Sequence, residues 1–186
     1  MAGNTTDVQI ASNALILLGH QPIASFTEPT AGAEVASNLY QSSYDSMLTT
    51  YRWRFATKKA QLARLSAAPI NEWSYAYQLP TDLLYVINTQ SSSNYEIYGD
   101  KLYTNAQTES IDYIYSVSPD KLPAYYVKAL ELFLAMQFAI PVTGDTDKAT
   151  IYQRMYEKQM KVARYTDSTQ RPQDSFVDSP YTDVRS

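Results

Sequence analysis

The sequence predicts a mainly α protein of the α+β class, built as a four-helix bundle with a small inserted antiparallel β unit and an extended C-terminal tail. Apolar residues recur at helical spacing in four segments, two before residue 67 and two after residue 118. Between them, period-two alternation and frequent aromatic and β-branched residues indicate strands. We therefore divide the chain into a helical bundle (1–66 and 119–166), an inserted β unit (67–118) and a C-terminal tail (167–186).

The first half of the bundle is expected to contain two helices. The first covers about residues 7–18, is capped by Thr5 or Thr6, and ends at Gly19, which supplies a helix stop. After a loop, Thr30 is the expected N-cap of a longer second helix, which leads directly into the stretch "YRWRFATKKAQLARL".

The β unit should contain a hairpin and at least one further strand. In "NYEIYGDKLYTN", the pair Gly99-Asp100 fits a two-residue turn that needs positive φ at its first position. Alternation over residues 111–117 predicts another, half-buried strand.

Two further helices follow. The third, about residues 123–140, is apolar on more than one face, so we place it in the middle of the bundle, ended by Pro141 and Gly144. The fourth starts at Asp145 or Thr146 and extends to about Tyr165. Its inward side is expected to carry Ala149, Tyr152, Met155, Tyr156, Met160 and Ala163. Its outer face carries Arg154, Lys158, Lys161 and Arg164.

Composition limits the possible functions. The chain has 186 residues and 45% hydrophobic content, enough for one core with a small appendage. It has no Cys, which excludes disulfides, thiolate metal sites and cysteine nucleophiles. The apolar runs are short and broken, and the first residues lack a signal-peptide pattern, so we expect neither a membrane partner nor export.

Charge is segregated along the chain. Residues 1–45 hold four acids and no bases, residues 46–71 five bases and no acids, and residues 72–118 six acids and one base. The net charge of −4 argues against a general nucleic-acid binder, because phosphate contacts need a basic footprint. Segregation suits complementary contact between neighbouring subunits.

The basic segment has three interpretations. It can be a solvated helix end in which Trp53 and Phe55 are core anchors of the bundle, a contact with nucleic acid, or a contact with an acidic surface of a neighbouring subunit. The overall acidity favours the last over strong duplex binding. The residues of this basic patch are Arg52, Arg54, Lys58, Lys59 and Arg64.

No catalytic arrangement is recognisable. The single histidine, His20, follows a helix end and is interpreted as a loop residue, and the acids have turn or capping duties. No glycine-rich phosphate loop is present. We expect no enzyme activity, no catalytic residue, no metal and no cofactor.

Tyrosine is abundant, with 17 residues, and many lie in the β unit. Because tyrosine is favoured at interfaces, an exposed aromatic sheet suggests protein contact, although simple sheet packing explains the same residues. We assign Tyr95, Tyr98 and Tyr103 to a face for a partner protein.

The order of segments resembles the head-to-tail adaptor (connector) family of tailed bacteriophages, in its tail tubular protein A variety. The resemblance covers roughly residues 7–166 and rests on "ALILLGHQPIASFTE", "YDSMLTTYRWRFATKKAQLA", "EWSYAYQLPTDLLYV", "LELFLAMQFAIPVTGD" and "YQRMYEKQMKVARYTD". It implies a non-enzymatic virion protein at the head-tail interface, assembled in the host cytoplasm. Such a protein forms a ring, usually a dodecamer, that docks on the portal, extends the DNA channel and carries the next tail or nozzle protein.

In this family the C-terminal segment commonly grips the portal, so the resemblance gives that role to residues 167–186. Its expected portal-binding residues are Arg171, Phe176, Val177 and Tyr181. The resemblance places the basic patch against an adjacent subunit, against the portal or in the channel. DNA is expected to pass through the channel without tight binding, which agrees with the net negative charge of the chain. The alternatives are a stopper or tail-completion protein, a nucleic-acid-binding module, and a cell-wall hydrolase carried on the virion.

Overall fold

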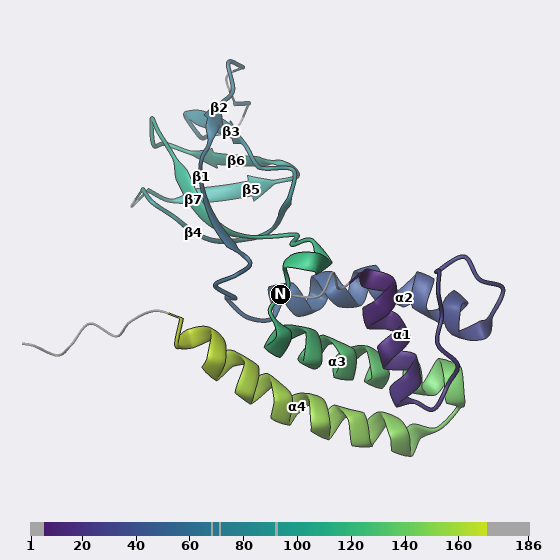
Figure 1. Ribbon diagram of the computed structural model, residues 1–186. Helices are drawn as coiled ribbons and strands as arrows, with labels where there is room; N and C mark the ends of the chain where they lie inside the picture. Colours follow the sequence, from purple (N-terminus) through teal and green to yellow (C-terminus); the bar gives the residue numbers. More distant parts are fainter. Residues whose placement is uncertain (1–5, 68, 71, 92, 171–186) are drawn as a thin grey trace, which may run out of the picture.

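The computed structural model describes residues 6–67, 69–70, 72–91 and 93–170, and in them the chain forms a helical body and a β lobe (Figure 1). The described residues contain four α-helices and seven strands, and the strands form two antiparallel sheets. The predicted mainly α class with a small β unit is therefore wrong, and the fold is α+β. The β lobe has a hydrophobic core of its own, built on Tyr77, Leu102 and Ile111.

The helices are α1 (Asp7–Leu17), α2 (Ala31–Thr49), α3 (Ala124–Thr143) and α4 (Thr146–Ser168). The side chains of Thr6 and Thr30 accept hydrogen bonds from the backbone N–H groups of Gln9 and Ala33, both at 3.2 Å, so the predicted caps are confirmed. Asp145 caps α4 in the same way.

Two details of the helix predictions are wrong. Helix α3 continues past Pro141, which lies in the last turn, and ends at Gly144, whose positive φ of 65° allows its N–H to bond the Ile140 carbonyl. Met155 on α4 is 45% exposed and not inward, because α4 packs with one narrow side on α3 and shows the rest to solvent.

Helix α3 is the centre of the helical body, with α1, α2 and α4 packed around it (Figure 1). Its length and composition would also suit a membrane span. Packing gives a sufficient reason for its apolar character, because Tyr126, Leu130 and Phe138 are fully buried against the other helices.

The β lobe contains β1 (Thr57–Gln61), β2 (Ala63–Arg64), β3 (Tyr75–Gln78), β4 (Leu83–Thr89), β5 (Tyr95–Tyr98), β6 (Lys101–Thr104) and β7 (Ser110–Tyr115). One sheet has the order β1-β7-β4 and the other β2-β3-β6-β5. The predicted hairpin is confirmed as β5–β6, with φ of 60° at Gly99.

Strands β1 and β2 fall in the range that the sequence placed in the helical bundle. Their polar, basic residues carry little strand signal, and pairing of Lys59 opposite Asp112 and of Ala60 opposite Ile111 holds β1 in the sheet. The strand predicted as half-buried, β7, is buried on both faces, because Ile111 and Tyr113 pack in the core of the β lobe and Ile114 packs in the core of the helical body.

Candidate interaction site at the junction of the helices and sheets

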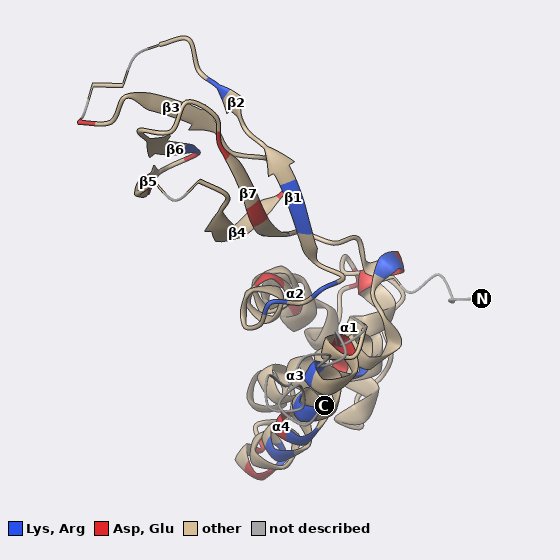
Figure 2. Cartoon of the chain, turned by 90° about the vertical axis from the view of Figure 1, so that its left-hand side faces the viewer, with Lys and Arg blue, Asp and Glu red and all other residues tan. Residues whose placement is uncertain are grey.

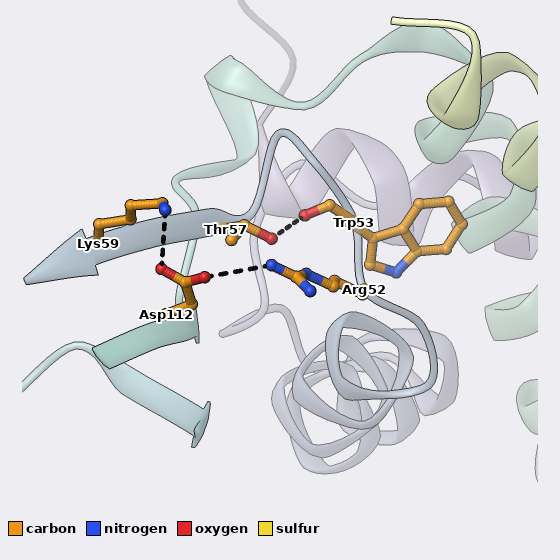
Figure 3. A network of polar contacts seen from close by, with 5 residues as sticks. All are labelled: Arg52, Trp53, Thr57, Lys59 and Asp112. Atoms are coloured by element: carbon orange, nitrogen blue, oxygen red, sulfur yellow. Dashed lines mark hydrogen bonds and ion pairs between the residues drawn. The ribbon is translucent and has the colours of Figure 1, made fainter. Parts of the chain in front are cut away.

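The junction loop, residues 50–56, joins α2 to β1 and carries the two predicted anchors. Trp53 is fully buried and donates a hydrogen bond from Nε1 to the Met47 carbonyl at 3.2 Å. Its ring meets Tyr126 of α3 edge to face at 5.1 Å, and Phe55, which is half-buried, meets the same tyrosine at 4.9 Å. Thr57 Oγ1 donates to the Trp53 carbonyl at 2.6 Å, and this hydrogen bond joins the middle of the loop to the first residue of β1 (Figure 3).

The C-terminal end of α4 is tied to the same loop. Asp167 is 1% exposed, and its carboxylate accepts the Arg54 N–H at 3.0 Å and the Tyr125 hydroxyl at 2.9 Å. Burial, together with this bond to a carboxylate, raises the pKa of Tyr125. The predicted tail begins at residue 167, whereas in the structure α4 includes Asp167 and Ser168.

Three of the predicted basic residues lie around one hollow of about 450 Å³, which we call the basic hollow. Its lining residues are Tyr51, Arg52, Arg54, Thr57 and Lys59. Arg52 and Lys59 reach Asp112 of β7 from two sides, at 3.3 and 3.5 Å (Figure 3). The Asp112 side chain is 5% exposed whereas both cations are mostly exposed, so the carboxylate is covered by its partners.

The basic hollow keeps a positive charge after this pairing. Arg52, Arg54 and Lys59 give three positive charges against two negative charges, on Asp112 and on Asp167, whose carboxylate accepts the Arg54 N–H, which leaves a net charge of +1. Within the described part of the chain, no carboxylate lies within ion-pair distance of the Arg54 guanidinium. The hollow can therefore accept an anionic group such as a carboxylate or a phosphate, with Arg54 as its first contact.

The other two bases of the predicted patch are not part of this hollow. Lys58 points to the other side of β1, where its ammonium lies 2.8 Å from Asp82 and 3.6 Å from the centre of the Tyr115 ring. This hydrogen bond holds the pKa of Asp82 below its ordinary value and raises that of Lys58. Arg64 of β2 lies over the Tyr75 ring at 4.0 Å.

The three tyrosines assigned to a partner face lie on the β5–β6 hairpin. Strand β5 is an edge strand of its sheet, and Tyr95 and Tyr98 on it are exposed, as is Ile97. Tyr103 of β6 is half-buried and meets the Tyr98 ring at 5.6 Å. This edge presents aromatic and apolar side chains together with Glu96, which accepts a hydrogen bond from Tyr98 at 2.6 Å.

The expected portal-binding residues Arg171, Phe176, Val177 and Tyr181 lie outside the described residues. His20 packs in the loop after α1, where its Nδ1 would lie 3.1 Å from a Cβ placed on Gly32. In the described residues, no group of three or more potential metal ligands gathers in one place.

Sequence reasoning missed the three acids that organise the junction, Asp82, Asp112 and Asp167. Asp112 alternates with apolar residues in a predicted strand, which would place it in solvent if only the opposite face of the sheet were covered. Only the register of β1 against β7 shows that it is buried beneath Arg52 and Lys59. Neither a protein-family model nor a curated protein sequence matches this chain.

Proposed function

We propose that this protein is a head-to-tail adaptor of a tailed bacteriophage: a structural ring protein that docks on the portal, extends the DNA channel and carries the next tail component. The observation that carries the proposal is the position of the end of α4. Asp167 fixes it to the junction loop beside the basic hollow, so the sequence that follows starts between the helical body and the β lobe.

That arrangement suits a connecting protein because it separates three possible contacts. The β lobe extends away from the helices, with the exposed edge of β5 on it (Figure 1). The chain beyond residue 170 starts at the junction, and the helical body is left to contact neighbouring copies. Many weak contacts of one segment, repeated around a ring, give tight attachment through effective concentration.

The test is co-sedimentation with rings of the portal protein encoded by the same phage genome. Full-length protein is compared with a chain that ends at Gln170, since a shorter chain would lose Asp167 and disturb the junction itself. We expect the full-length chain to sediment with the portal and the truncated chain to stay in the supernatant. If full-length protein never joins the portal, the adaptor function is wrong.

Two substitutions separate the basic hollow from the C-terminal segment. Arg54→Ala removes a cation with no acidic partner among the described residues, so it should weaken portal binding without changing stability if the hollow takes part. The matched control is Lys121→Ala, which removes an exposed cation from the short 3₁₀ helix (Pro119–Lys121). If Arg54→Ala binds the portal as well as the wild type does, the basic hollow takes no part in portal binding, and the C-terminal segment alone is the attachment.

The second candidate function is a nucleic-acid-binding module, which the basic hollow favours. Three of the five bases of the predicted patch are engaged with Asp82 and Asp112, which leaves a small footprint for phosphates. Salt-dependent retention on DNA that Arg54→Ala abolishes would favour that candidate over the adaptor.

A further inference from the structure

The outer side of α4 carries apolar residues as well as the predicted bases. Tyr165 is 72% exposed, and the other members of the set are about half exposed. Their spacing puts them on one side of the helix, which we call the outer stripe. The outer stripe consists of Ile151, Met155, Val162 and Tyr165.

No described part of the same chain covers this stripe. Helix α4 uses its other side to pack on α3, where Met160 and Ala163 are buried and the Tyr156 ring meets Phe133 at 5.1 Å. The stripe runs along most of the helix, so it differs from the single exposed apolar residues that any surface shows.

Basic residues border the outer stripe. Arg154, Lys158 and Lys161 are exposed, and within the described residues none of them forms an ion pair. Figure 2 shows these blue segments along α4. A partner for the stripe therefore needs apolar surface and negative charge together.

The same chain offers such a surface at the start of α2. A hollow of about 510 Å³, which we call the α2 hollow, is lined by Phe26 and Pro29 together with the carboxylates of Glu28 and Glu34. Residues 1–45 contain no Lys or Arg, and Lys148 of α4, which reaches this region, donates to the Leu18 carbonyl. Beyond Glu34, the outward side of α2 continues with Asn38, Gln41 and the half-exposed Asp45.

The two surfaces lie on helices that pack on different sides of α3. In Figure 1 α2 and the loop before it lie above α3, and α4 lies below it. They cannot meet within one chain, but every copy carries one of each. Contacts between two different patches of identical chains are heterologous, and they propagate until a ring closes or a filament forms.

The geometry points to the α2 hollow of a neighbouring copy of this chain as the docking site of the outer stripe of α4. The apolar residues of the stripe would be buried against Phe26 and Pro29, while the bases beside it would face Glu28 and Glu34. This inference rests on the proposed function, because it names the surfaces by which copies of the adaptor associate.

The experiment reverses one charge on each surface. Lys158→Glu changes the stripe and Glu34→Lys changes the α2 hollow; matched controls are Lys121→Glu and Asp120→Lys, which make the same changes at exposed positions of the short 3₁₀ helix (Pro119–Lys121). Sedimentation velocity is run on each protein alone over a range of concentrations, and again on each protein bound to portal rings. Circular dichroism checks that every variant is folded.

Each reversal should weaken self-association by about tenfold or more, whether read as a dissociation constant or as copies bound per portal ring, while the controls match the wild type. An equal mixture of the two defective variants should regain association. In that mixture the unaltered stripe of one variant meets the unaltered α2 hollow of the other. The two altered surfaces also meet, with both charges reversed, so that they attract again.

The outcomes separate this inference from the proposed function. If the protein binds portal rings and neither charge reversal changes the number of copies bound, the docking is wrong and the adaptor function is retained. A chain that associates through these surfaces but ignores the portal keeps the docking and overturns the adaptor function. A chain that neither self-associates nor joins the portal overturns both.

Discussion

Replacing Asp167 with Ala should destabilise the whole protein, although the residue lies in the last turn of α4. Its buried carboxylate accepts two hydrogen bonds, from the Arg54 N–H and the Tyr125 hydroxyl, and the substitution leaves both donors without this acceptor. A hydrogen bond to a charged group contributes about 1.5–3 kcal/mol, and the Tyr125 end is only part-buried, so we expect a loss of about 2–4 kcal/mol. Asp167→Asn keeps one acceptor oxygen and should lose roughly half of that.

The assay is urea unfolding at pH 7, followed by circular dichroism and by tryptophan fluorescence. For a chain of this size each kcal/mol lowers the melting temperature by about 2–4 °C, so the Ala variant should also melt visibly earlier. Glu157→Ala is the matched control, because it removes an exposed acid from the same helix and should change stability by less than about 0.5 kcal/mol.

Hydrogen exchange gives a local test of the same contact. If Asp167 holds the junction loop, the Arg54 amide should lose protection in Asp167→Ala even under conditions where the rest of the protein stays folded. A variant that unfolds at the wild-type urea concentration, with an equally protected Arg54 amide, would refute the reasoning.

Four further substitutions test other parts of the fold by the same unfolding assay. Trp53→Ala should cost about 3–5 kcal/mol because it opens a cavity against Tyr126, whereas Tyr95→Ala on the exposed edge should cost under about 0.5 kcal/mol. Gly99→Ala should cost about 1–2 kcal/mol, since it places a Cβ at a φ of 60°. The hydrogen bond from Lys58 lowers the pKa of Asp82 in the folded protein. The Asp82–Lys58 pair therefore stabilises the fold above about pH 4, and this stabilisation is lost as the pH falls further. Asp82→Asn should flatten the dependence of the unfolding free energy on pH in that acidic range.

The sequence predicted the helices well because their signals are local. Thr6, Thr30 and Asp145 act as caps through contacts with residues two or three positions away, and Gly19 and Gly144 adopt the positive φ that ends a helix. The β5–β6 hairpin was predictable for the same reason, since its turn type depends on Gly99 alone.

The extent of the β lobe could not be predicted, because its pairing is long-range. Strand β1 reads "TKKAQ", a polar segment with no alternation, and it becomes a strand only through its partner β7, some fifty residues away in the sequence. The exposed stripe on α4 was missed for a related reason. Met155 is spaced as if it shared a helix face with the buried residues of α4, and only the narrow contact between α4 and α3 shows that its side chain faces solvent.

The junction shows why charge segregation along a sequence does not by itself indicate contact between subunits. The base-only segment 46–71 and the acid-rich segment 72–118 are partners within one chain, because Lys58 pairs with Asp82, and Arg52 and Lys59 pair with Asp112. Figure 2 shows the blue of β1 beside the red of β7. Much of the segregation is thus a consequence of antiparallel pairing, in which opposite charges face each other across strands.

Besides the basic hollow, unbalanced charge lies on the acidic start of α2 and on the basic outer side of α4. These two surfaces belong to elements that both pack on α3 but on different sides of it, so the fold keeps them apart. Each surface is solvated in a single chain, and the two can pair with each other only between chains. The proposed docking therefore rests on the charge that the fold leaves unpaired, and not on the segregation of charge in the sequence.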